Sequence, residues 1–280
     1  PRRPISSRFD DLVTKTAALA MSKTESDTSK PANPTDDSDV LMQMLHTLAD
    51  VLEVAEARKY SYASSYVQPC SRGGPTVWVT RYVDYTSKYG LGFLLNDGSS
   101  GVYFNDSTKA VLEVEGETFQ YIERKRVETR EVGVRRTEPT CGTHTLSEYP
   151  ETLQKKVTLL KHFRNYLIEQ QKKADDDGSA INTVDAVASA LPLTYLKKWV
   201  RTKHAILFRL SNQTVQIVFY DQTEVLLTPD ERYITYVDKK RQRLTYQLND
   251  ELVGSNAEMA KRLMYAKEIL HQLLTGQQRR

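Results

Sequence analysis

The spacing of apolar residues predicts three amphipathic helices. Leucines recur every three to four residues between positions 41 and 52, which is typical of a helix with one buried face. A second helix is predicted at about 150–169, where Pro150 suits the first helical position. A third is predicted to begin at Ser255 as N-cap, with Glu258 completing a capping box, and to stop at Gly276. Each apolar face must pack against another element.

Two blocks rich in Val, Tyr, Phe and Thr alternate with these helices. The first follows a loop at 70–75, and the second extends from about Leu193 to Leu248. Asn96-Asp97-Gly98 and Glu115-Gly116 are typical of tight turns between antiparallel strands. Residues 1–38 and 172–190 are polar and without periodicity, so they are predicted to be a linker and a connector.

The two strand blocks resemble each other. Phe104–Leu112 aligns with Phe219–Leu227 at an offset of 115, and the same offset brings Tyr121–Lys125 over Tyr236–Lys240. The sequence therefore predicts a duplicated module of several antiparallel strands and one C-terminal helix. The copies are expected to pack together, because a one-faced sheet must bury its apolar side. A cleft between related halves is a common place for ligands and peptides to bind.

Composition narrows the function classes. The 280 residues carry 39 Lys and Arg against 36 Asp and Glu, a formal net charge of +3, which argues against a nucleic-acid binder. Two cysteines cannot form a disulfide framework, and no apolar run is long enough to span a membrane. We expect neither a secreted nor a membrane protein. The 16 tyrosines favour sheets and binding surfaces.

Catalytic and metal motifs are not found. Gly90-Leu91-Gly92 begins like a glycine loop, but Leu95 stands where the third glycine would be. Cys141 and His144 form an isolated metal-like pair, expected in a loop without further ligands. We expect no enzyme activity, no metal and no cofactor in this chain.

Two basic stretches have open interpretations. The run 197–204 has four basic residues and a tryptophan, so it could meet phosphate or an acidic peptide. The other interpretation, which the residues favour slightly, is a solvated strand edge that lysines protect from aggregation. The cluster at 124–136 is interleaved with glutamates and is better interpreted as a solvated hairpin.

Several segments together resemble the polo boxes of polo-like kinases. Tyr82–Phe93, Gly101–Thr108, Gln120–Arg124 and Lys155–Tyr166 resemble the first box, Leu191–Thr202 and Leu210–Ile217 the second, and Asp39–Leu52 the polo-cap helix. The resemblance implies an α+β fold of two pseudo-repeated polo boxes, each a six-stranded antiparallel sheet with a C-terminal helix, after an N-terminal cap helix. The implied boundaries are linker 1–38, cap helix 39–58, first box 77–170, connector 171–190 and second box 191–275.

The resemblance also implies a role. The chain would be the non-catalytic targeting region of a cell-cycle serine/threonine kinase, whose kinase domain lies upstream, uses ATP and magnesium, and is restrained in cis. Expected partners are proteins or peptides, with or without phosphate, and a homodimer is possible; nucleic acid and membrane are not expected. Members of the family act in the cytoplasm and at centrosomes or basal bodies, kinetochores and the spindle.

The family binds a Ser-phosphoSer/Thr peptide along the shared edge of the boxes. By position, the implied cleft residues are Tyr82, Asp84, Gln171, Lys172, Arg201, Lys203, Tyr220, Gln222 and Glu224. Gln222 and Glu224 stand where the family has a His and a Lys that grip the phosphate. Two like charges ~4 Å apart cost ~4 kcal/mol at an effective dielectric of about 20. Repulsion by Glu224 therefore predicts weak or lost phosphate dependence, which Glu224→Lys with Gln222→His should restore.

Two alternatives to this interpretation stay open. A shifted basic pocket around Lys172, Arg201 or Lys203 would still read phosphate, and a homo-oligomeric scaffold would need no peptide. A second, aromatic groove is implied on the first box by Val83, Tyr85, Tyr89, Leu159, Phe163 and Tyr166. For Leu159 and Phe163, a place in the core between sheet and helix is equally open.

Overall fold

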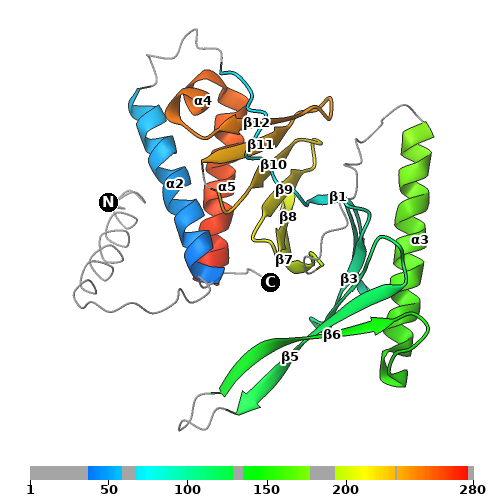
Figure 1. Ribbon diagram of the computed structural model, residues 1–280. Coiled ribbons are helices and arrows are strands. Elements are labelled where there is room, and N and C mark those ends of the chain that lie inside the picture. Colours follow the sequence, from blue (N-terminus) through cyan, green and yellow to red (C-terminus); the bar gives the residue numbers. More distant parts are fainter. Residues whose placement is uncertain (1–36, 59–66, 129–134, 177–192, 231, 277–280) are drawn as a thin grey trace. The chain divides into compact units, whose positions relative to one another are not determined.

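The computed structural model describes residues 37–58, 67–128, 135–176, 193–230 and 232–276 (Figure 1). The predicted linker up to residue 36 and connector residues 177–190 lie outside the described residues. The described chain holds two six-stranded antiparallel sheets, each followed by helix, and an N-terminal helix. The predicted α+β class is confirmed.

The first sheet is a meander in chain order. Its strands are β1 (Val79–Tyr85), β2 (Gly90–Leu95), β3 (Ser100–Phe104), β4 (Lys109–Leu112), β5 (Thr118–Glu128) and β6 (Arg135–Thr145). A 3₁₀ turn (Glu151–Leu153) leads into α3 (Gln154–Asp176), which buries Val157, Leu160 and Leu167. The helix continues past its predicted end at 169, and an ion pair between Lys173 and Glu169 (2.8 Å) supports this polar last stretch.

The second sheet repeats the first. Its strands are β7 (Leu196–Arg201), β8 (Ala205–Leu210), β9 (Val215–Phe219), β10 (Glu224–Leu227), β11 (Tyr233–Val237) and β12 (Arg243–Gln247), followed by α4 (Asp250–Ser255) and α5 (Ala257–Thr275). Ser100 pairs with Leu112, as Val215 pairs with Leu227. Ser107 and its counterpart Gln222 both have positive φ, 67° and 74°. The predicted duplication at offset 115 is therefore present in the register and the turns.

The N-terminal end of α5 differs from its prediction. The side chain of Asn256, not of Ser255, accepts the capping hydrogen bond, from Met259 N–H at 2.9 Å. Ser255 ends the separate helix α4, which the sequence did not predict and which Asn249 caps through Leu252 N–H. The predicted capping box is wrong because the extended backbone of Asn256 separates two helices. The predicted stop at Gly276 is confirmed by its left-handed φ of 67°.

The isolated pair Cys141 and His144 lies in β6, not in a loop. Both residues are in register with β5, where His144 pairs with Phe119. The polar sequence around Cys141 suggested a loop, but β6 pairs with β5 along its whole length and includes both residues. Within the described ranges, no group of three or more His, Cys, Asp and Glu is placed to hold a metal ion. No described helix is long and apolar enough to cross a membrane.

Helix α2 (Asp37–Ala57) packs beside α5 and α4 (Figure 1). Its buried Leu41, Leu45 and Leu48 join the core cluster of the second sheet. Apolar side chains of this spacing explain why the helix forms and where it docks.

The two sheets share a core, as predicted. Leu91, Phe93 and Leu95 of β2 lie in one buried cluster with Leu196, Ile206, Phe208 and Leu210 of β7 and β8. The apolar side chains that β2 and β8 direct to this core explain the packing, since burial of each contributes about 1.5–3 kcal/mol. The shared core holds the edges of the two sheets close together, and a cavity lies along this junction.

Candidate functional site: a cleft between the two sheets

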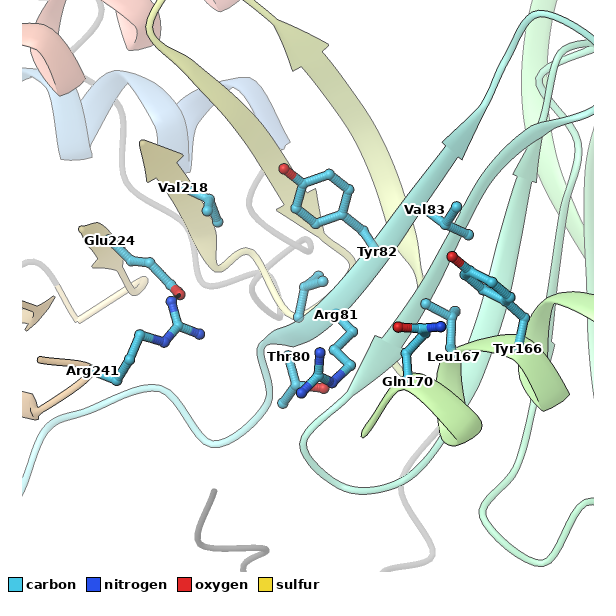
Figure 2. A pocket seen from close by; sticks show the side chains of 11 residues that line it. Thr80, Arg81, Tyr82, Val83, Tyr166, Leu167, Gln170, Val218, Glu224 and Arg241 are labelled. Atoms are coloured by element: carbon cyan, nitrogen blue, oxygen red, sulfur yellow. Dashed lines mark hydrogen bonds and ion pairs between the residues drawn. The ribbon is translucent and has the colours of Figure 1, made fainter. Parts of the chain in front are cut away.

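A cavity of about 310 Å³ opens between the boxes (Figure 2). It is lined by Val79, Thr80, Arg81, Tyr82, Val83, Tyr166, Leu167, Gln170, Val218, Glu224 and Arg241. These residues come from β1, α3, β9, β10 and the turn before β12. The cavity thus has walls from both halves of the duplication.

Glu224 is the buried charge of this cavity, with only 4% of its surface exposed. Its Oε1 accepts a hydrogen bond from Arg241 Nη1 at 2.8 Å, and its Oε2 accepts one from Gln216 Nε2 at 2.8 Å. Figure 2 shows the carboxylate and the guanidinium pointing toward each other. Both carboxylate oxygens are therefore engaged, and Arg241 balances the charge.

Gln216 connects this pair to the other sheet. Its Oε1 accepts from Val79 N–H at 2.8 Å, and its Nε2 donates to Val79 C=O at 2.9 Å. Glu224 thus orients the amide that holds the first residue of β1. Glu224 therefore has a structural role that could not be predicted from the sequence.

This geometry corrects the predicted repulsion. An incoming anion would meet an Arg241–Glu224 ion pair and not a bare carboxylate. The penalty of ~4 kcal/mol for two unscreened like charges therefore does not apply. The affinity of the cavity for anions therefore depends on Glu224 and Arg241 together, and not on Glu224 alone.

Arg243 adds a third charged group beside this pair. Its guanidinium lies 3.8 Å from the centre of the Trp78 ring. Burial lowers the pKa of Arg243 to about 10, against the opposing charge of Glu224. The guanidinium stacked on the indole is consequently part of a buried structural cluster.

Tyr82 and Asp84 follow each other along β1 at the edge of the cleft. The Tyr82 ring meets Phe208 edge-on at 5.1 Å, and burial raises the pKa of its phenol. Asp84 forms an ion pair with Arg201 of β7 and accepts hydrogen bonds from Thr86 N–H and hydroxyl. Burial alone would raise the pKa of Asp84, but the Thr86 hydrogen bonds and the Arg201 charge outweigh it and lower the pKa. Arg201 is therefore engaged by Asp84.

The remaining predicted cleft residues are spread around the cavity. Gln171 is half-buried, and Lys172, Lys203 and Gln222 are exposed. Tyr220 is 53% exposed, and its hydroxyl donates to Thr202 C=O at 3.1 Å. Of the nine predicted positions, only Tyr82 and Glu224 line the cavity itself.

Seven of the eleven cavity residues were not predicted as site residues, and Arg81, Gln170 and Arg241 have the longest polar side chains among them. Arg81 is adjacent to Tyr82 and Gln170 to Gln171, so neighbours of the predicted positions were the available signal. Arg241 gave no such signal, because its contact with Glu224 spans a strand pairing and a turn.

The predicted aromatic groove divides into core and surface. Phe163 is 8% exposed and belongs, with partly buried Leu159, to the core between sheet and α3. Tyr85, Tyr89 and Tyr166 are 49%, 44% and 48% exposed. The rings of Tyr85 and Tyr89 stack with centroids 6.5 Å apart. Val83 packs against the same core and also lines the cavity. The exposed tyrosines form an aromatic surface next to the cleft.

Gly92 of β2 permits the close packing below this surface. A Cβ at this position would lie 2.4 Å from a ring carbon of Phe163. Only glycine lets α3 approach the sheet this closely.

Two six-stranded antiparallel sheets, each followed by helix and joined along a cleft, define the polo-box class of protein-interaction domain. The family model described as "POLO box duplicated region" matches residues 87–157 and 202–263. The chain belongs to the polo-box family.

The individual relatives that this chain resembles are serine/threonine-protein kinases, which it matches over part of their length. It is 41% identical over 202 residues to the Xenopus laevis serine/threonine-protein kinase PLK1, covering 71% of this chain and 31% of that kinase. It is 37% identical over 203 residues to Caenorhabditis elegans plk-1, covering 72% of this chain and 29% of that protein. The chain spans about a third of the length of these relatives. The described residues form polo boxes and a cap helix, without a kinase domain.

A solved structure confirms the fold. The budding yeast Cdc5 polo-box domain in complex with an Spc72 phosphopeptide matches with a TM-score of 0.61 and 21% identity. The match covers 97% of this chain and 98% of that chain. The same Cdc5 domain in complex with the Dbf4 polo-interacting region matches with a TM-score of 0.57 and 20% identity.

Proposed function

We propose that this chain docks peptide segments of partner proteins in the cleft, and that phosphate contributes little to their binding. The observation that carries the proposal is the Glu224 carboxylate, held by Arg241 and Gln216 within the cavity. Its neighbour at the second grip position, Gln222, has no charge. Neither position supplies the cation with which the family grips phosphate.

Magnitudes favour this proposal. A phosphate that used the remaining N–H donors of Arg241, whose side chain is 43% exposed, would meet a guanidinium whose charge Glu224 already balances, and it would lie close to that carboxylate. A hydrogen bond to a charged group returns roughly 1.5–3 kcal/mol. Gln222 could add one neutral hydrogen bond of about 0.5–1.5 kcal/mol. These contributions together leave little additional binding free energy for a phosphorylated peptide over an unphosphorylated one.

Paired peptides test the proposal directly. Fluorescence anisotropy would compare a peptide library with fixed Ser-Thr and its Ser-phosphoThr counterpart on the full chain. We expect affinities within about threefold, because 1.4 kcal/mol would be needed for tenfold. The control is Tyr82→Ala, which should weaken both peptides equally. A phosphopeptide preference of tenfold or more contradicts the proposal.

A phosphopeptide reader is the second candidate. It is favoured by Arg81, which lines the same cavity as Arg241 and whose Nε is buried without a partner. Under this candidate, Arg81→Met would remove a strong phosphate preference. Under the first candidate, the two peptides would stay equal in this variant.

We also propose the wider setting from the kinase relatives. The intact protein would be a serine/threonine kinase that uses ATP and magnesium, with its polo boxes restraining and targeting the kinase domain. A fluorescent fusion of this chain should concentrate at centrosomes or basal bodies, kinetochores or the spindle. A uniformly diffuse signal through mitosis would contradict this targeting role.

A further inference from the structure

Arg81 differs from the other described arginines that bury their Nε without a hydrogen-bond partner. The arginines of this kind are Arg81, Arg164, Arg209 and Arg262. The last three each donate a hydrogen bond from another guanidinium nitrogen. Arg81 forms no hydrogen bond and no ion pair with any described residue, although it lines the cavity of the cleft. A buried donor without an acceptor costs free energy, so a ligand that carries an acceptor would stabilise Arg81.

A β-bulge directs Arg81 into the cavity. Val79 pairs with Leu95 and Arg81 pairs with Leu94, so Thr80 is an extra residue in β1. In a regular strand Val79 and Arg81 would share a face, and Val79 belongs to the core between the sheets. The extra residue turns Arg81 away from this core, and its side chain is half-buried at the cavity wall.

Arg81 lies on the wall that the first sheet and α3 form. Its side chain and that of Tyr82 leave β1 in opposite directions (Figure 2). Tyr82 packs against the core between the sheets, whereas Val83, on the same face as Arg81, packs against the core below α3. Gln170 of α3 also lines the cavity. Glu224 comes from the second sheet, so Arg81 would contact a different part of a docked segment.

The charges of the cavity leave one cation without a counterpart. Its charged lining residues are Arg81, Glu224 and Arg241, and Arg241 balances Glu224. Arg243 is stacked on Trp78 and does not line the cavity. The single remaining positive charge matches one carboxylate, which a guanidinium binds through two parallel hydrogen bonds. A phosphate dianion would bring a second negative charge into a cavity that already contains Glu224.

We propose that Arg81 selects an Asp or Glu side chain in the segment that docks in the cleft. The inference rests on the proposed function, because it assigns one contact of the peptide that this function requires. The acidic residue is a separate determinant from the Ser-Thr pair, since Arg81 and the family's grip positions belong to different sheets. A partner with an acidic residue at this place is bound without being phosphorylated.

The second box supplies a matched control. Its strand β7 has the same bulge, since Leu196 pairs with Leu210 and Lys198 pairs with Arg209. Lys198 is therefore the repeat counterpart of Arg81, but it does not line the cavity. Its substitution removes a half-buried cation at an equivalent strand position without changing the cleft.

The test is the affinity of unphosphorylated fluorescent peptides for the full chain, measured by anisotropy. Each peptide keeps a central Ser-Thr and has a single Glu at one flanking position, and a paired peptide has Gln there. We expect one position at which Glu binds about tenfold more tightly than Gln, because only the carboxylate accepts two charge-assisted hydrogen bonds. Arg81→Met should make the two peptides equal, whereas Lys198→Met should keep the tenfold difference.

Charge reversal gives a second readout. Arg81→Glu should bind a peptide with Lys at the selected position about tenfold more tightly than the Glu peptide. Loss of folding would weaken both peptides and cannot produce this reversal, so the proposal stays falsifiable even if Arg81→Met is unstable.

The failure of this inference is distinguishable from that of the proposed function. Equal affinity of Glu and Gln peptides at every position, or a Glu preference that persists in Arg81→Met, would overturn the inference and leave the proposed function intact. A phosphoSer that binds tenfold more tightly than Glu at the selected position would also overturn it, because Arg81 would then bind phosphate. A tenfold gain on phosphorylation of the central Thr would instead contradict the proposed function.

Discussion

At the scale of single residues, the hydrogen-bond partners of Glu224 change the role expected for it, from repelling an anion to holding Arg241 and Gln216 in place. The sequence identified it correctly as an acid in place of a base, and the resemblance placed it at the cleft. Its hydrogen bonds to Arg241 and Gln216 could not be predicted, because they depend on the register of β9 to β12 and on the turn that carries Arg241.

Glu224→Lys is therefore expected to destabilise the fold, whether or not Gln222→His accompanies it. The new ammonium would lie beside Arg241, with Gln216 losing its acceptor. The expected loss is roughly 3–5 kcal/mol of unfolding free energy, since the new charge would be buried at a position that is only 4% exposed, without an opposite charge beside it. Urea denaturation measures it.

Glu224→Gln is the matched control for this prediction. It keeps an acceptor for Gln216 and removes only the charge, so a smaller loss is expected. If Glu224→Lys were as stable as the wild type, the ion pair would have no structural role.

Lys109 predicts a pH dependence of stability. Burial lowers its folded pKa to about 8, below the ordinary value of 10.5, so the unfolded chain binds more protons between these values. Its contribution to stability therefore rises with pH across this window. Lys109→Met removes the contribution, and its stability advantage over the wild type should shrink from pH 7.5 to pH 10. A constant difference across this range, measured by urea denaturation, would contradict the lowered pKa; Lys161→Met serves as the exposed control.

At the scale of elements, the duplication made most of the fold predictable. Register, bulges and turns repeat because the same apolar pattern and the same Asp-x-Thr turns occur twice. Asp106 accepts from Thr108 as Asp221 accepts from Thr223. The predicted helix boundary at 255–258 was wrong. Ser255 and Asn256 are adjacent candidates for the N-cap, and only the backbone geometry decides between them.

The cap assignment gives a direct comparison of two neighbours. Asn256→Ala should cost about 1 kcal/mol of unfolding free energy, because the Met259 N–H loses its acceptor. Ser255→Ala should stay within about 0.5 kcal/mol, the usual range for substitutions away from such features. The reverse order of the two effects would restore the capping box predicted from sequence.

At the scale of the whole molecule, the cleft follows from joining two related sheets. The sequence predicted that the copies pack and that ligands would bind between them. It could not predict which side chains line the cavity, because Tyr82 and Glu224 do so while Lys172 and Lys203 are exposed. The resemblance assigns all nine predicted residues to one cleft. The direction of each side chain depends on the strand or helix that carries it, so some of them do not reach the cavity.

Gln216 tests the connection between the sheets. Gln216→Ala removes both hydrogen bonds to Val79 and leaves Glu224 with Arg241 alone. We expect a loss of about 1–3 kcal/mol of unfolding free energy, because buried backbone groups become unsatisfied. Hydrogen exchange should show faster exchange of the Val79 amide than in the wild type. Unchanged exchange there would contradict the role of Gln216 between the boxes.

Self-association remains a proposal for the whole molecule. Sedimentation of the full chain at several concentrations would decide it, and a strict monomer would dismiss a homo-oligomeric scaffold.

The central claim is that Glu224 balances the charge of Arg241, so that phosphate gains little in the cleft. A crystal structure of the chain with a bound Ser-phosphoThr peptide tests it most directly. The account predicts Arg241 Nη1 still about 2.8 Å from Glu224 Oε1, with the phosphate directed to solvent. An Arg241 guanidinium hydrogen-bonded to the phosphate, whether or not Nη1 stays on Glu224, would contradict it.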